Sequence, residues 1–222
     1  MKDEEAREEK RRRLYRDALE ELMGLDLEEQ AARGAFSCTR LPDGGTRLDI
    51  PSFGDVIRVS LPSGEMEVPG HIDSLSMRVL ALRYVKKADG TPPSGKWVAY
   101  RDLPGGRFYA ATLVPTVEQP LAQAFGRTPH SLAPLAEELG GERSDYGDES
   151  YVFKPFPHTP LLVVLHWGDE EFEPQCRVLF DSCCPSYLNT DDLKILATQL
   201  AAYLLRPVAG EEAVENLLWM VE

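Results

Sequence analysis

The sequence lacks any apolar run long enough to cross a bilayer. Its longest uninterrupted apolar segment, residues 160–165, is far shorter than the roughly 20 residues of a membrane-spanning helix. The first five residues carry charges and no apolar stretch follows them, which is not the pattern of a secretory signal. We therefore expect a cytoplasmic protein with no membrane partner.

Positive charge is also in short supply. The chain has 24 Lys and Arg against 37 Asp and Glu, a formal net charge of -13, so its field repels phosphate backbones. Residues 137–173 concentrate the negative charge, with ten acidic residues against Arg143 and Lys154. We expect no nucleic-acid partner.

The motifs of several common sites are missing. The four cysteines have no Cys-x-x-Cys spacing and the four histidines have no i, i+4 pair, so neither zinc nor iron-sulfur ligation is indicated. The chain has no Gly-x-Gly-x-x-Gly pattern, no lysine-bearing phosphate loop and no Gly-x-Ser-x-Gly elbow. Nothing in the residues selects a substrate, and the cofactor stays unknown.

What the sequence does contain is an ordinary globular composition, 43% hydrophobic and 27% charged over 222 residues. Residues 3–33 show helical spacing at Leu14, Ala18, Leu22 and Leu25, and Gly34 is placed to end the helix. We expect an N-terminal amphipathic helix over residues 1–34 and a single domain over residues 35–222. The basic run of residues 10–13 is interpreted as a solvated helix face, because acidic residues surround it.

Alternating apolar positions then predict an antiparallel meander, with strands around Leu48, Val59 and Met66. Helices are expected from Asp73 or Ser74 to before residue 89, over residues 115–125, and from Thr128 to residue 140. A strand is favoured at residues 97–100.

The last third predicts strands at residues 151–153, 161–165 and 176–180, the middle one central in its sheet because it is apolar throughout. A helix should open at Thr190 and bury Leu193, Leu196, Leu200 and Leu204, followed by a short helix over residues 214–221. The expected fold class is α+β: a mainly antiparallel sheet with flanking helices and a long N-terminal helix.

Residues 75–205 resemble an uncharacterised domain family, one of the "domains of unknown function" found mainly in anaerobic bacteria and archaea. The resemblance rests on these segments: Leu82-x-Tyr84; Trp97-Val98-x-Tyr100-Arg101-Asp102-Leu103-Pro104-Gly105-Gly106; Phe125-Gly126; Leu139-Gly140-Gly141; Gly147-Asp148; Pro160-Leu161; Trp167-x-Asp169-x-Glu171-Phe172; Leu179-Phe180-Asp181; and Leu188-x-Thr190-x-Asp192-Leu193. Family members are often joined to an iron-sulfur domain of corrinoid-protein type. Fusion to such a domain implies a role in anaerobic one-carbon metabolism. This chain differs, because its N-terminus is a charged helix without the cysteine motif of an iron-sulfur domain.

Residues 166–181 supply candidate metal ligands: His166, Glu171 and Asp181. The alternative interpretation is that these acids bind backbone amides of turns. If the strands 161–165 and 176–180 are antiparallel, Glu171 and Asp181 lie at opposite ends of the sheet, roughly 16 Å apart. On that geometry Glu171 anchors its turn and Asp181 orders residues 182–189.

Aromatic residues form a second candidate site. Trp97, Tyr100, Tyr109 and Trp167, with Phe108 and Phe125, could line a pocket for a planar ligand, and His158 could be its axial ligand. An ordinary core and a turn histidine are the alternatives. The adjacent Cys183 and Cys184 suggest either a soft-metal or redox role, or one thiol buried and one loosely exposed.

Three functional hypotheses follow. The first is a binding or accessory protein, possible ligands being tetrapyrrole-like or other planar cofactors. The second is a metal-assisted enzyme that uses the acidic segment. The third is an interaction protein whose residues 1–33 dock on a partner or on a second copy, with folding back on its own core as the alternative.

Overall fold

The computed structural model describes residues 2–211, 214 and 217. Its N-terminal region forms two helices, α1 (Lys2–Glu20) and α2 (Leu27–Gly34), so the prediction of one helix over residues 3–33 is wrong. The cause is Asp26, whose extended backbone begins α2 and whose carboxylate accepts hydrogen bonds from the N–H groups of Glu28 and Glu29, both at 3.1 Å. Gly34 ends α2, as expected.

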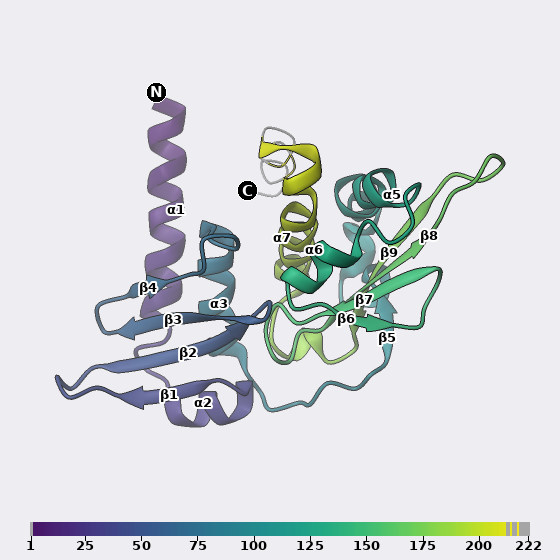
Figure 1. The fold of residues 1–222 in the computed structure, drawn as a ribbon. Coiled ribbons are helices and arrows are strands. Elements are labelled where there is room, and N and C mark those ends of the chain that lie inside the picture. The colour runs from purple at the N-terminus through teal and green to yellow at the C-terminus, as the bar shows by residue number, and fades with distance from the viewer. Residues whose placement is uncertain (1, 212–213, 215–216, 218–222) are drawn as a thin grey trace.

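Helix α1 stands at one edge of the molecule, and its first turns extend past the neighbouring elements (Figure 1). The helix packs on α3, and two apolar residues are buried: Ala18 in its last turns and Leu22 just after its end. The apolar stripe of the N-terminal region therefore folds back on the chain's own core. Docking of residues 1–33 on a partner stays a prediction.

The first sheet is an antiparallel meander in the order β1-β2-β3-β4. Its strands are β1 (Ser37–Arg40), β2 (Thr46–Ser52), β3 (Asp55–Leu61) and β4 (Glu65–Glu67). The meander is confirmed. The sequence did not predict β1, because this strand is largely exposed and has no alternation of apolar residues.

The second sheet has the order β5-β9-β8-β7-β6, with antiparallel neighbours throughout. Its strands are β5 (Trp97–Ala99), β6 (Glu142–Ser144), β7 (Glu149–Phe153), β8 (Leu161–His166) and β9 (Gln175–Asp181). β8 is central, and its first five residues are at most 6% exposed, which confirms the prediction from its continuous apolar run. The α+β class is confirmed.

Four further helical segments accompany the sheets. Three are single helices: α3 (Leu75–Lys87), α6 (Ala133–Glu138) and α7 (Thr190–Ala209). The fourth is continuous over residues 110–125 and consists of α4 (Ala110–Leu113), η3 (Val114–Glu118) and α5 (Gln119–Phe125). Ser74 caps α3 through Met77 N–H at 3.1 Å, and the four predicted leucines of α7 are buried. The helix expected from Thr128 begins only at Ala133, after His130 adopts a left-handed backbone with φ 63°. Of the predicted terminal helix, Val214 and Leu217 are buried, whereas Leu218 and Val221 lie outside the described residues.

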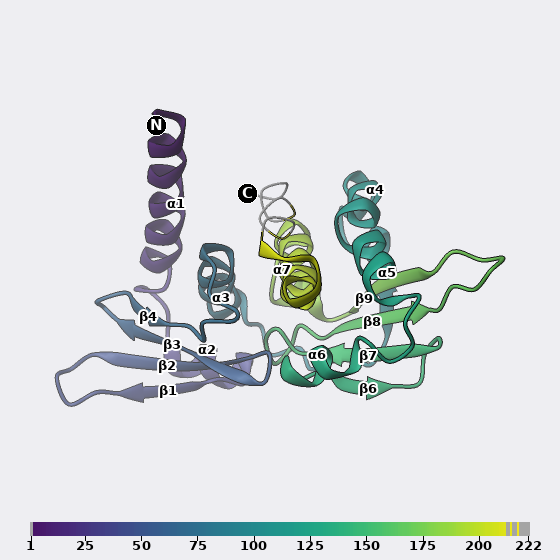
Figure 2. The ribbon, with the colours of Figure 1, turned by 45° about the horizontal axis from the view of Figure 1, so that its top comes forward.

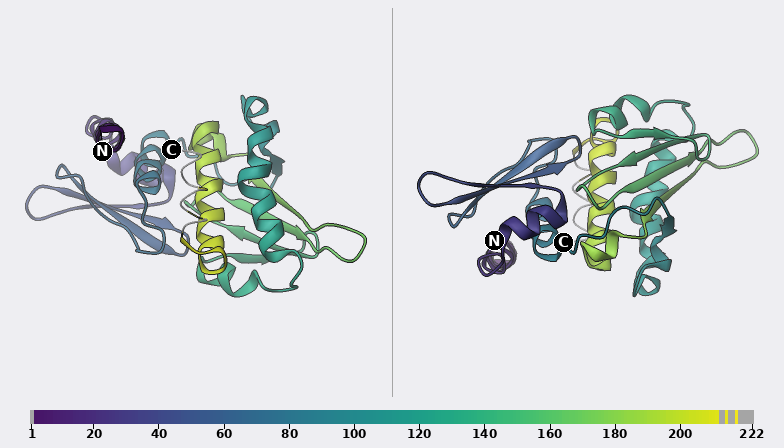
Figure 3. Two further views of the ribbon diagram at one scale, coloured as in Figure 1. Left: turned by 90° about the horizontal axis from the view of Figure 1, so that it is seen from above. Right: turned by 90° about the horizontal axis from the view of Figure 1, so that it is seen from below.

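Helices α3, α7 and α5 stand on the same side of the two sheets (Figures 2 and 3). Short 3-10 turns, η1 (Tyr100–Asp102), η2 (Gly106–Phe108) and η4 (Cys184–Ser186), complete the connections. No helix among the described residues is long and apolar enough to cross a membrane.

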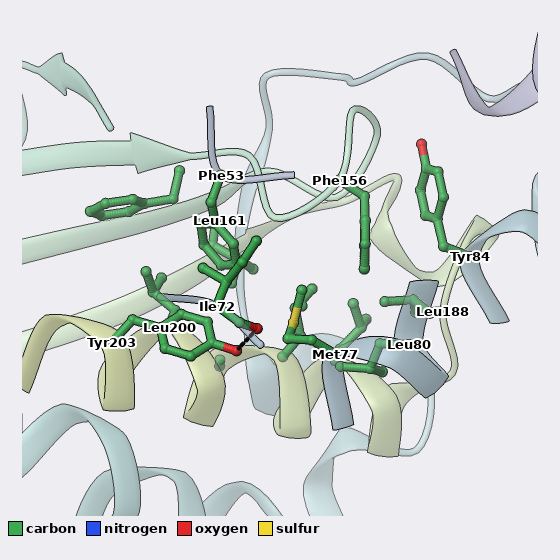
Figure 4. Packing of buried hydrophobic residues seen from close by; sticks show 14 of the residues in the cluster. Phe53, Ile72, Met77, Leu80, Tyr84, Phe156, Leu161, Leu188, Leu200 and Tyr203 are labelled. Carbon is green, nitrogen blue, oxygen red and sulfur yellow. Dashed lines mark hydrogen bonds between the residues drawn. The ribbon is translucent and has the colours of Figure 1, made fainter. Parts of the chain in front are cut away.

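One buried apolar cluster runs through both sheets and the helices between them. Phe53, from the β2–β3 turn, meets Tyr203 of α7 edge to face, with ring centroids 5.7 Å apart. Figure 4 shows Phe53 beside Leu161 and above the α7 residues Leu200 and Tyr203, with Met77 and Leu80 of α3 in the same layer. The boundary predicted at residue 34 stays a prediction.

Candidate functional site

A cleft of about 610 Å³ lies between α1, the last turns of α3 and the start of α7. We call it the α1/α3/α7 cleft. Its lining residues are Leu14, Asp17, Ala18, Glu21, Arg83, Lys86, Lys87, Tyr187, Leu188, Asn189, Asp191 and Asp192. Tyr187 and Leu188 are fully buried and form its floor.

The position of the α3 cations follows from how that helix ends. Gln30 of α2 is buried and its Nε2 donates to the carbonyls of Val85 and Lys86, at 3.1 and 2.7 Å. These carbonyls belong to the last turn of α3, where intrahelical partners run out. The α2–α3 contact therefore fixes the turn that carries Lys86 and Lys87.

Three cationic side chains line the cleft, and two of them form ion pairs with carboxylates. Arg83 pairs with the buried carboxylate of Asp192, and Lys86 pairs with Glu21 of α1 at 2.9 Å. Lys87 differs, because its ammonium donates to the neutral carbonyl of Pro185. Burial lowers the pKa of Lys87, and the carboxylates of Asp192 and Asp89 act against that shift through space.

Beneath the floor, aromatic rings stack in series. Tyr84 stacks on Phe156 at 4.8 Å and on Tyr187 at 5.3 Å, as Figure 4 shows for Tyr84 and Phe156. The hydroxyl of Tyr84 donates to Gly34 O at 2.7 Å, at the end of α2. Burial raises the pKa of Tyr84 and raises that of Tyr187 to about 12, so both phenols stay protonated and hold the floor in place.

His158 contacts the floor residue Tyr187 through a hydrogen bond. Its Nδ1 lies 2.6 Å from the hydroxyl of Tyr187, which also lies 2.6 Å from the carbonyl of Thr91. Because a carbonyl can only accept, the Tyr187 proton goes to Thr91 and His158 donates from Nδ1. Burial lowers the pKa of His158, which favours the neutral imidazole.

The aromatic residues proposed as ligand-binding do not converge. Trp97 pairs with Asp181 across β5 and β9. Tyr100 is buried and donates to Thr190 O at 3.1 Å. Tyr109 is 50% exposed and lies under Lys194, and Trp167 follows β8 at the other end of the sheet, edge-on to His130.

None of Trp97, Tyr100, Tyr109, His158 or Trp167 lines the α1/α3/α7 cleft, although His158 contacts Tyr187 of its floor. Phe125 is buried on α5, whereas Phe108 is 88% exposed. The set is divided between core, surface and the two ends of the second sheet.

The structure also separates the proposed metal ligands. The β8–β9 register pairs His166 with Gln175 and Leu161 with Phe180, so His166 and Glu171 lie at the hairpin end and Asp181 at the opposite end. Among the described residues, no group of three or more His, Cys, Asp and Glu side chains could hold a metal ion. The antiparallel arrangement expected from the sequence is confirmed.

Asp181 binds backbone instead. Its buried carboxylate accepts from the N–H groups of Ser94, Gly95 and Cys183 at 3.0, 2.7 and 2.9 Å, and from the Ser94 hydroxyl at 2.7 Å. Burial would raise its pKa, but these hydrogen bonds hold the pKa below its ordinary value. Asp181 orders the start of residues 182–189, as expected, and the loop before β5 as well.

Asp169, not Glu171, anchors the β8–β9 turn. Its Oδ1 accepts from the N–H groups of Glu171 and Phe172, both at 2.8 Å. An aspartate reaches amides two and three residues ahead more readily than a longer glutamate does. The expectation for Glu171 is wrong.

The two adjacent thiols are both buried, Cys183 at 4% and Cys184 at 0% exposure. Their Sγ atoms donate to His158 O at 3.3 Å and Pro160 O at 3.5 Å. The expectation of one loosely exposed thiol is wrong, since η4 folds both against the β7–β8 loop. All four cysteines are free.

A second groove, of about 680 Å³, lies between α1 and the β3–β4 region. Its lining residues are Glu9, Arg12, Tyr15, Arg16, Gly64, Met66, Leu75 and Arg78. Tyr15 already donates to Gly64 O at 2.6 Å, and Arg78 binds Asp73 and Met66 O. Half of its lining residues come from α1.

The chain belongs to the family described as Domain of unknown function (DUF3786), whose model matches residues 26–203. No curated protein and no solved structure matches it. The matched region contains the floor and the cation-bearing wall of the α1/α3/α7 cleft but leaves out α1. A function shared by the family must reside within the matched residues, which favours this cleft over the second groove.

Sequence reasoning missed Arg83, Lys86, Lys87 and Asn189 as site residues. A signal was present, because two segments that carry the family resemblance, residues 82–84 and 188–193, frame the cleft. It went unused because cations near a helix end are typical of any solvated helix.

Proposed function

We propose that this domain is a binding module that takes a small organic anion in the α1/α3/α7 cleft. The observation that carries the proposal is Lys87, a half-buried ammonium in the cleft wall whose hydrogen bond goes to a neutral carbonyl. A partly desolvated cation gains most from an anionic partner. Carboxylates and phosphates share the required chemistry.

The rest of the lining supplies orientation. The side chain of Asn189 makes no capping hydrogen bond to α7, so its amide is available to a ligand. Leu14, which is 39% exposed, offers apolar surface for a carbon skeleton. The volume of the cleft lies in the range of small-molecule sites, roughly 300–1,000 Å³, and its largely charged and polar lining suits a polar ligand.

Binding is favoured over catalysis by the residue types present. The described residues that line the cleft include no Ser, Thr, Cys or His, and two of its carboxylates, Glu21 and Asp192, are held in ion pairs with Lys86 and Arg83. Tyr187 is fully buried and protonated, so it supports the floor.

Calorimetry and thermal unfolding with a panel of ligands test the proposal. The panel holds small monocarboxylates, dicarboxylates, inorganic phosphate and phosphorylated sugars, together with haem and a corrinoid for the planar cofactor implied by the sequence resemblance. A ligand present at 100 times its Kd should stabilise the fold by about 2.7 kcal/mol.

Lys87→Met should weaken binding of the best anion by about tenfold or more, since hydrogen bonds to charged groups contribute about 1.5–3 kcal/mol. Lys154→Met is the matched control, because Lys154 pairs with Glu142 at 2.6 Å on the second sheet. The proposal fails if no anion binds, if haem or the corrinoid alone binds, or if both variants behave alike.

A further inference from the structure

The outer face of the helical segment α4–η3–α5 is exposed yet uncharged. Residues 110–125 contain one charged side chain, Glu118, and it is buried at 7% exposure. The exposed residues of the segment are Ala111, Thr112, Val114, Pro115, Gln119 and Gln123. In a chain with 27% charged residues, such depletion is typical of the centre of a protein interface.

Charges of opposite sign flank the two ends of this face. At its start lies the exposed Arg107, next to Phe108 at 88% exposure, while the neighbouring Arg101 is paired with Asp102 at 3.9 Å. At its end, the β8–β9 hairpin joins α5 through Gly168 N–H to Gly126 O at 2.9 Å. The hairpin exposes Asp169, Glu170 and Glu171, and Phe172 at 69%, while Glu173 is paired with Arg127 at 2.7 Å.

A face that is basic at one end and acidic at the other is complementary to itself when turned by 180°. The uncharged segment is about 24 Å long, from 1.5 Å per helical residue. In Figures 2 and 3 the segment lies on the outer side of α7 and the hairpin projects beyond it. Antiparallel pairing about a two-fold axis would place Arg107 of one copy near Glu171 of the other, twice.

We propose that the occupant of this face is a second copy of the chain, paired antiparallel through α4–η3–α5. The small side chains Ala111 and Thr112 permit close helix approach, and Val114, 45% exposed, adds apolar surface to the face. Two-fold dimers with one shared surface patch are the commonest oligomers. This surface is distinct from the cleft and independent of its ligand.

Sedimentation velocity of the full chain over a range of concentrations tests the proposal. We expect a monomer–dimer equilibrium for the unchanged protein and a monomer for Val114→Glu, which places a charge in the uncharged face. Thr39→Glu, on the exposed strand β1, is the control and should dimerise normally. Circular dichroism checks that each variant is folded.

A charge exchange tests the orientation. Arg107→Glu and Glu171→Arg should each weaken the dimer by roughly tenfold, since symmetry applies each change twice, and the double variant should restore it. A monomer at every concentration overturns the proposal, as does a dimer that tolerates Val114→Glu. A dimer that the double variant fails to restore overturns the antiparallel arrangement.

Discussion

Gly54 and Gly140 lie against each other where the two sheets meet: a methyl group on Gly140 would sit 2.9 Å from the Cα of Gly54. Gly54 turns the chain between β2 and β3, and Gly140 follows α6. Beside them, Phe53 N–H donates to Lys154 O at 3.0 Å. The first sheet is thus joined to the second by backbone contact as well as by the apolar core.

Gly140→Ala should therefore destabilise the protein for two separate reasons. Its φ of +65° strains any residue with a Cβ by about 1 kcal/mol, and the added methyl should cost a further ~1–3 kcal/mol by overpacking. Gly44→Ala is the control, because Gly44 has φ +87° and nothing within 4 Å of its added Cβ. Urea unfolding that gives equal losses for the two variants would show that the Gly54 contact is unimportant.

Asp181→Asn should cost about 3 kcal/mol of unfolding free energy, because an amide retains one acceptor oxygen and turns an NH2 group toward backbone N–H donors. Asp145→Asn, at an exposed position, is the control and should change little. The loop of residues 91–96 should become sensitive to protease in the Asp181 variant alone, since Ser94 and Gly95 lose their anchor.

The same carboxylate predicts a pH dependence. The pKa of Asp181 is held below its ordinary value of 3.8 in the folded chain, so its stabilisation is present above about pH 4 and is lost as pH falls further. The difference in stability between the unchanged protein and Asp181→Asn should shrink below that pH. A difference that stays constant down to pH 2.5 would contradict the assignment.

The sequence predicted an element correctly where a local pattern of residues was enough to determine its secondary structure. The apolar run of residues 161–165 predicted a central strand, and Ser74 predicted the start of α3, because burial and capping leave local signatures. The break at Asp26 was missed, since its capping competes with a helical stripe that continues on both sides. β1 was missed because its pairing with β2, not its own composition, makes it a strand.

The candidate site was harder to predict than the fold. The antiparallel separation of Glu171 and Asp181 followed from strand order and proved correct. The cleft did not, because it brings together residues 14–21, 83–87 and 187–192, and no local pattern reports contacts over such separations. Aromatic residues were grouped by type, whereas Trp167 and Trp97 lie at opposite ends of the second sheet.

Glu118 binds a backbone N–H at the edge of β9, so position 118 should tolerate an amide side chain better than an apolar one. Its buried carboxylate accepts from Val178 N–H at 3.1 Å, where β5 no longer pairs with β9. Glu118→Leu should cost about 1–3 kcal/mol because it leaves that N–H unpaired. Glu118→Gln keeps an acceptor and should cost less, and equal losses in urea unfolding would refute the role.

Burial raises the pKa of Glu118, so the sign of its pH dependence is opposite to that of Asp181. The folded state favours the protonated carboxyl, which means that this group contributes most below the unfolded pKa and that the contribution is lost as pH rises through the folded value. Relative to Glu118→Gln, the unchanged protein should become less stable between pH 4.5 and 7. A flat difference would contradict the raised pKa.

His158 gives the last prediction, through its contact with Tyr187. In the unfolded chain the imidazole has its ordinary pKa of 6.5, whereas burial lowers the folded value, with the Arg33 carbonyl and Asp89 acting in the opposite direction. Below about pH 6.5 the unfolded state therefore binds a proton that the folded state resists, and stability falls with pH, by at most about 1.4 kcal/mol per unit. His158→Asn can still donate to the Tyr187 hydroxyl but cannot titrate, so its stability relative to the unchanged protein should improve between pH 7 and 5.5. Parallel urea-unfolding curves across that interval, or a nitrogen NMR spectrum that shows the proton on Nε2, would mean that His158 does not support the cleft floor through Nδ1.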